Sequence, residues 1–120
     1  MDLTDRLRMI CLALPEATEK EAWGDPTWRI RDKIFAMLKR GDGRPSVWMK
    51  APEGAQDMLV GAAPDRFYRP PYVGHKGWIG VRLDTGPKDG EPDWDEIAHH
   101  LRKSFKLTAP KRILKQMEIG

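Results

Sequence analysis

The segment from Trp23 to Lys50 constrains the fold most, because apolar residues alternate with polar and basic ones over three short runs. Alternation with a period of two is typical of half-buried β-strands. Two breaks separate the runs, the pair Asp32-Lys33 and the glycine-containing residues 41–45. The segment therefore predicts three consecutive antiparallel strands.

The first hairpin would have its turn at residues 32–33. Because directly opposite residues share a face of a sheet, one face then collects the bulky apolar side chains of Trp28, Ile30, Phe35 and Met37. The other face carries Thr27, Arg29, Arg31, Ile34, Ala36 and Leu38. Asp-Lys is not a favoured turn pair, but a slip of one residue would bury arginine. We therefore expect the arginines on the solvent side of the sheet.

The rest of the chain predicts helices and further strands. Thr4 is the expected N-cap of a first helix that ends at Pro15, and residues 15–25 are expected to be irregular. Expected after the third strand are a short helix over 52–63, strands over 66–69 and 77–84, a loop over 85–92 and helices from 93 onward. The order predicts an α+β fold, with an antiparallel sheet of about four to five strands and helices packed on one face. The length of 120 residues favours a single domain over 1–120.

Composition favours a cytoplasmic protein. The chain has one cysteine, Cys11, so no internal disulfide can form. Its first residues form neither a signal peptide nor a membrane span, because charges interrupt the short apolar run. We expect no membrane partner and take a monomer as the working expectation.

Positive charge is concentrated in two segments. Residues 28–50 hold seven Lys or Arg and two Asp, and residues 101–120 hold six Lys or Arg and one Glu. The remainder of the chain is acidic. If the fold joins the two basic segments, it creates a patch suited to polyanions. The alternative is that they lie on different faces and only maintain solubility.

Three stretches of this sequence resemble the MmcQ/YjbR family of small bacterial proteins. They read CLALPEATEKEAWGDPTWRIRDKIFAML, HKGWIGVRLD and HHLRKSFKLTAPKR, and they follow the family's order over most of the chain. The positions that match the family's pattern are Trp23, Gly24, Trp28, Lys33, Phe35, His75, Trp78 and Ser104. The resemblance implies a compact α+β fold like that of the frataxin/CyaY group, and DNA binding through a double-wing motif.

One predicted binding surface is the solvent side of the sheet, where Trp78 and Arg82 alternate with the apolar residues of the strand over 77–84. The other is a β-hairpin wing that enters a groove of duplex DNA. Cations neutralise phosphates, and tryptophan can stack on a base. The expected nucleic-acid-binding residues are Arg29, Arg31, Lys33, Trp48, Lys50, His75, Lys76, Trp78 and Arg82. The alternative is that the arginines are only the solvated side of the sheet, with Trp48 and Trp78 packed under loops.

No catalytic or metal-binding pattern stands out. His99 and His100 are adjacent and point about 100° apart on a helix, so they cannot both join one compact site. Together with Cys11 they offer no familiar zinc spacing. We therefore expect no catalytic residue, metal or cofactor, and an enzyme is the less favoured class. A second hypothesis is a binding protein for a small anionic ligand or a peptide, with a cleft near His75, Trp78 and Arg69.

Overall fold

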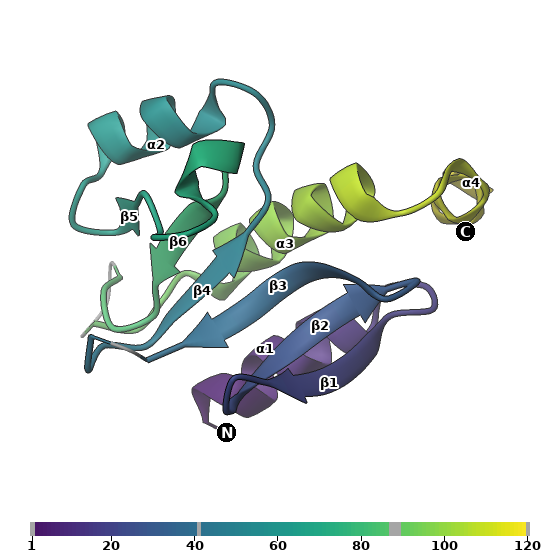
Figure 1. Cartoon of the computed structure of the whole chain (residues 1–120), viewed down its shortest axis with the longest axis horizontal. Helices are drawn as coiled ribbons and strands as arrows, with labels where there is room; N and C mark the ends of the chain where they lie inside the picture. The colour runs from purple at the N-terminus through teal and green to yellow at the C-terminus, as the bar shows by residue number, and fades with distance from the viewer. Residues whose placement is uncertain (1, 41, 87–89, 120) are drawn as a thin grey trace.

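The structure, a computed structural model, describes residues 2–40, 42–86 and 90–119. Figure 1 shows one twisted sheet with the helices labelled α1 and α3 behind it. The elements are α1 Leu3–Leu12, β1 Thr18–Ala22, β2 Asp25–Ile30, β3 Lys33–Lys39, β4 Ser46–Met49, α2 Ala55–Ala62, β5 Phe67–Tyr68, the 3-10 helix η1 Gly74–Lys76, β6 Ile79–Arg82, α3 Trp94–Thr108 and α4 Lys111–Ile119. The strands lie in the order β1-β2-β3-β4-β6-β5, and all pairs are antiparallel. The α+β prediction is confirmed.

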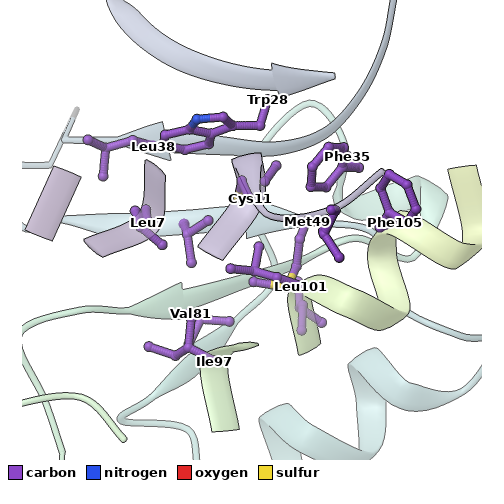
Figure 2. Close-up of a cluster of buried hydrophobic side chains, with 14 of the residues drawn as sticks. Leu7, Cys11, Trp28, Phe35, Leu38, Met49, Val81, Ile97, Leu101 and Phe105 are labelled. Carbon is purple, nitrogen blue, oxygen red and sulfur yellow. The ribbon is translucent and has the colours of Figure 1, made fainter. Parts of the chain in front are cut away.

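Two helices, α1 and α3, supply the core on one face of the sheet (Figure 1). Leu7 and Cys11 of α1 lie beside Leu101 and the other core side chains (Figure 2). Phe105 of α3 packs edge-on against Phe35 of β3, with ring centroids 5.3 Å apart. Each large apolar side chain buried in this way contributes about 1.5–3 kcal/mol relative to exposure. In the described part of the chain these helices therefore hold one face of the sheet firmly, and no α-helix covers the other face.

The helix caps differ partly from expectation. Asp2, not Thr4, caps α1, because its carboxylate accepts a hydrogen bond of 2.8 Å from the Asp5 backbone N–H. Asp93 caps α3 in the same way through the N–H of Glu96. Both arrangements satisfy donors that the first helical turn leaves free.

An additional strand, β1, forms where irregular structure was expected. Its sequence is TEKEA, which has no apolar alternation to signal a strand. Trp23 and Gly24 connect it to β2, and their φ angles of 55° and 84° suit a two-residue hairpin turn. This edge strand brings the sheet to six strands.

The predicted register of the β2–β3 hairpin is wrong. Arg31 and Asp32 form the turn, with φ angles of 52° and 64°, and Ile30 pairs with Lys33. The register then shifts, so that Phe35 has no partner on β2. Phe35 stays in the core with Trp28 and Ile30, as predicted, and the shift exchanges the two faces only for the part of β3 after Phe35. Ala36 and Leu38 are therefore core residues, and Met37 lies on the opposite face.

The buried hydroxyl of Ser104 connects α3 to this irregular point. Its Oγ donates to the Phe35 carbonyl at 2.6 Å and accepts from the Lys50 backbone N–H at 2.9 Å. A buried polar group is stable only when its partners are present. Ser104 thus satisfies backbone groups next to the register shift and at the end of β4.

Two further expectations concern the loop and membrane insertion. Within the expected loop over 85–92, residues 87–89 lie outside the described residues. Among the helices that the structure describes, none is long and apolar enough to cross a bilayer.

Candidate nucleic-acid interface

We call the helix-free side of the sheet the open face. Strand pairing sets one row of it across five strands, which consists of Thr27, Met37, Trp48, Gly80 and Tyr68. The neighbouring row consists of Lys39, Ser46 and Arg82. The alternation of side chains along each strand therefore gives the open face aromatic and cationic groups, while intervening residues fill the core.

Tyr68 lies across this face and holds its neighbours in place. Its ring covers Gly80, where a Cβ would come within 2.4 Å of the ring. Its hydroxyl accepts a hydrogen bond of 2.6 Å from Trp48 Nε1 and lies 2.6 Å from Ser46 Oγ. The Arg82 guanidinium stacks 4.2 Å from the ring centroid. Glycine at position 80 is thus required by the close approach of the tyrosine.

Two adjoining hollows of about 450 and 480 Å³ lie on the open face. Trp23, Lys39, Trp48 and Tyr72 line both of them. The Lys39 ammonium lies 5.1 Å from the ring centroid of Trp23 and 5.3 Å from that of Trp48. These distances place a positive charge between two aromatic rings, which is a favourable cation–π arrangement.

The outer walls of the hollows are exposed aromatic rings. Trp23 is 74% exposed and Tyr72 is 87% exposed. Both have positive φ angles, 55° and 67°. Bulky residues rarely adopt this conformation, and such strain is common at ligand sites. The exposed aromatic area together with the backbone strain singles out this surface.

The open face carries both acidic and basic side chains, and some of its cations have no carboxylate partner among the described residues. Arg82 pairs with Asp42 at 2.6 Å, and its hydrogen bond holds the pKa of that carboxyl below the ordinary value. Asp42 therefore stays charged and neutralises Arg82. Within the described part of the chain, Arg29 and Lys39 have no carboxylate within ion-pair distance. Asp25 also lines one hollow.

Three of the nine predicted binding residues lie on the open face. They are Arg29, whose Nε donates to Thr27 Oγ1 at 3.1 Å, Trp48 and Arg82. Arg31 and Lys33 lie instead at the end of the hairpin, because the turn is one residue earlier than expected. There Arg31 pairs with Glu16 at 3.0 Å.

The other four predicted residues lie away from the open-face hollows. Trp78 is only 7% exposed, and its carbonyl accepts a hydrogen bond from the Gln56 side chain of α2. Lys50 follows the last residue of β4, so strand alternation no longer directs it, and it lines a small hollow with residues of α2 and α3. His75 and Lys76 are exposed on η1.

The two basic segments do not form one patch on the sheet. The C-terminal segment builds α3 and α4, whose Leu101, Phe105 and Ile113 belong to the core on the helical side. Arg102 and Lys106 line a hollow between these helices. The alternative that the basic segments lie on different faces is therefore the arrangement found.

Sequence reasoning missed Trp23, Lys39, Tyr68 and Tyr72 as site residues. Trp23 lies in a turn, and Lys39 was placed only as part of a basic segment. Tyr72 follows two prolines and has no strand pattern around it. The Trp23-Gly24 pair was a local signal of a turn, but the positive φ angle of the tryptophan is visible only in the structure.

Two titratable groups, one buried and one half-buried, have pKa values shifted by their surroundings. Burial raises the pKa of the Cys11 thiol and disfavours the reactive thiolate. Burial lowers the pKa of His100, which packs against the Phe67 ring. Across residues 2–40, 42–86 and 90–119, no three ligating side chains gather at a metal-binding distance.

His75, Trp78 and Arg69, near which a cleft for a small anionic ligand was predicted, do not line the two hollows of the open face. Trp78 is buried, and the Arg69 side chain packs against Gly74, where a Cβ would come within 2.6 Å of Arg69 Cγ. The hollows of the open face are the better location for such a ligand. The face as a whole offers stacking surfaces and cations, which is chemistry for binding.

Comparison with known proteins finds a matching sequence family and a solved structure with a similar fold. A protein-family model described as YjbR matches residues 12–107. The crystal structure of Deinococcus radiodurans protein DR2400, described as having a DUF419 domain, superposes with a TM-score of 0.73 at 19% sequence identity. The superposition covers 89% of this chain and 78% of that one, and at this identity it supports the fold alone. No curated protein matches this sequence.

Proposed function

The chain belongs to the YjbR family, and we propose that it binds single-stranded nucleic acid on the open face of its sheet. The observation that carries the proposal is the grouping of exposed aromatic rings around a cation that has no carboxylate partner among the described residues, with Trp23 and Tyr72 beside Lys39. Proteins that hold single strands combine aromatic stacking surfaces with cations along the backbone. Each stacked base contributes about 1–3 kcal/mol in such proteins.

A single strand fits this surface better than a duplex. Bases in a duplex already stack on one another, so their faces are closed to Trp23 and Tyr72. A β-hairpin wing that enters a groove needs free cations at its tip. At the tip of the β2–β3 hairpin Arg31 is paired with Glu16, so among the described residues only Lys33 is there as a cation without an ion pair. This distribution of charge supports the sheet face over the wing.

The test is a fluorescence-polarisation titration of a short labelled oligothymidylate over a range of salt concentrations. Single-strand binding predicts a linear fall of log K with log salt, with a slope of about −0.7 for each neutralised phosphate. The double variant Arg29→Gln/Lys39→Met should weaken binding and flatten this slope. Both residues lie on the open face and lack carboxylate partners among the described residues.

The matched control is Lys111→Gln/Arg112→Gln, which removes the same charge from exposed positions of α4 on the helical side. It should change binding much less. Equal losses in the two double variants, or binding that ignores salt, would contradict the proposal. The proposal also implies a cytoplasmic location, where the single cysteine, Cys11, would stay reduced.

A small anionic ligand is the second candidate function, because the hollows have the size of small-molecule sites, roughly 300–1,000 Å³. Oligonucleotide length separates the two candidates. A nucleic-acid surface gains affinity as the strand lengthens across further cations, whereas a closed ligand site binds a mononucleotide as tightly as an oligomer.

A further inference from the structure

We propose that the hollow of about 480 Å³, in which Met37 and Val73 join Trp23, Lys39, Trp48 and Tyr72, binds one nucleotide, with its base against the aromatic rings and its phosphate at the Lys39 ammonium. We call it the nucleotide pocket. This inference rests on the proposed function and deepens it, because it assigns a base-stacking position within the wider surface. Four observations support it.

The floor of the pocket is preorganised. The indole N–H of Trp48 is already bonded to the Tyr68 hydroxyl, which also contacts Ser46 Oγ. Arg82 covers the Tyr68 ring and is fixed by Asp42. Trp48 therefore offers a ligand the face of its ring and not its N–H. A ring held in this way loses little freedom on binding, which favours affinity.

The walls of the pocket come from two separate turns. Trp23 lies between β1 and β2, and Tyr72 lies between β5 and η1. Both rings remain largely exposed although each backbone is in a conformation that bulky residues rarely adopt. Asparagine or glycine would relieve that strain. Large aromatic groups at both positions are therefore explained by a use for their exposed faces.

Lys39 supplies a cation that is held loosely. Rings, not carboxylates, hold its ammonium in the described structure, at 5.1 and 5.3 Å from the two centroids. Such contacts contribute about 0.5–1 kcal/mol each at exposed sites. A phosphate can therefore draw the ammonium away from a tryptophan ring and leave that ring free for a base.

Charge complementarity favours a nucleotide over other ligands. A cationic ligand would be repelled by Lys39, which already occupies the space between the tryptophans. A ligand with dense negative charge would be repelled by Asp25 and Asp42 in the adjoining hollow. A neutral planar ring that carries one phosphate satisfies the rings and the ammonium together.

The experiment compares two probes of equal length, a labelled oligothymidylate and an abasic sugar-phosphate oligomer. The wild-type protein should bind the oligothymidylate about tenfold more tightly, because only that probe can stack. The variants Trp23→Asn and Tyr72→Asn should each bring the ratio of affinities toward one without changing the affinity for the abasic probe. Asparagine tolerates the positive φ angle at both positions, so the turns are kept.

Two further variants complete the test. Lys39→Met keeps the apolar stem and should weaken both probes, reducing the slope of log K against log salt by about 0.7. Leu107→Asn removes an exposed apolar side chain from α3 and should leave the ratio unchanged.

The outcomes separate the two proposals. Salt-dependent binding of both probes with equal affinity would overturn the nucleotide pocket and leave the proposed function standing. Binding of neither probe by the folded wild-type protein would overturn the proposed function, and the pocket with it. A base preference that persists in both asparagine variants would place stacking elsewhere on the surface and overturn the pocket alone.

Discussion

Trp28 and Trp48 lie in the same sheet on opposite faces. Trp28 faces the helices, is fully buried and donates its N–H to Glu19 at 2.8 Å. Trp48 faces away from the helices, lines both hollows and donates its N–H to Tyr68. In both cases a hydrogen bond fixes the indole, but only on the open face does the ring remain available to a ligand. The difference shows that the layer of helices, not the residue type, decides what a tryptophan does.

The largest expected difference between the two faces is in how much an aromatic side chain contributes to the free energy of unfolding. Phe105→Ala removes a fully buried ring that packs against Phe35, and we expect a loss of about 3–5 kcal/mol in the free energy of unfolding. Tyr72→Ala removes an exposed ring from the open face and should change that free energy by less than about 0.5 kcal/mol. Urea denaturation of both variants measures the contrast. Comparable losses would mean that the open-face aromatic residues are structural.

A smaller effect is expected from Ser104→Ala, which tests how the two layers are joined. The variant leaves the Phe35 carbonyl and the Lys50 N–H without their buried partner, at a cost of about 1–3 kcal/mol. Thr18→Ala, at an exposed position of β1, is the control and should have little effect. If both variants had the same urea midpoint, the serine would not be holding the register shift.

The smallest expected effect is on the pH dependence of stability, and it comes from an ion pair on the helical side of β1. Arg8 of α1 binds Glu19 through two hydrogen bonds of 2.8 and 3.0 Å, and it holds the pKa of that carboxyl below its ordinary value. A lowered pKa contributes stability above the ordinary value of about 4.3, and that stability is lost as the pH falls through the lowered value. Because this ion pair is exposed to solvent, screening keeps its contribution to stability small.

Glu19→Gln should therefore unfold more easily than the wild type at neutral pH, with the difference shrinking in acid. Urea midpoints measured from pH 7 down to about pH 3 check this expectation. Glu21→Gln, in the same exposed strand, is the matched control and should change stability equally little at all pH values. A constant difference for Glu19→Gln over that pH range would exclude the ion pair as its cause.

Part of the fold was predictable because its signals are local. Residues such as Ile97, Leu101 and Phe105 repeat at helical spacing, and Ile79 and Val81 alternate, so α3 and β6 were predicted. The hairpin register was not predictable, because the backbone at the shift, Phe35, is bonded to Ser104, which lies 69 residues away. The strand β1 was missed because its stability comes from pairing with β2 and from the Glu19 contacts, not from apolar alternation.

The candidate site was predicted less completely than the fold. Arg29, Trp48 and Arg82 were placed on the correct face, because alternation along a strand is enough to assign a side. The pairing of Arg82 with Asp42 could not be foreseen, since it joins a strand to a loop 40 residues away. The walls of the nucleotide pocket could not be foreseen either, because Trp23 and Tyr72 meet Lys39 only after three separate segments fold together.

The sequence by itself determined the α+β class, the family and the presence of an apolar face on the central strands, because these depend on periodicity and on runs of matching residues. Only the tertiary structure decided which cations are free, which tryptophans are covered and where a hollow forms. Ion pairing and burial depend on distances between segments far apart in the chain, and no local pattern encodes those distances.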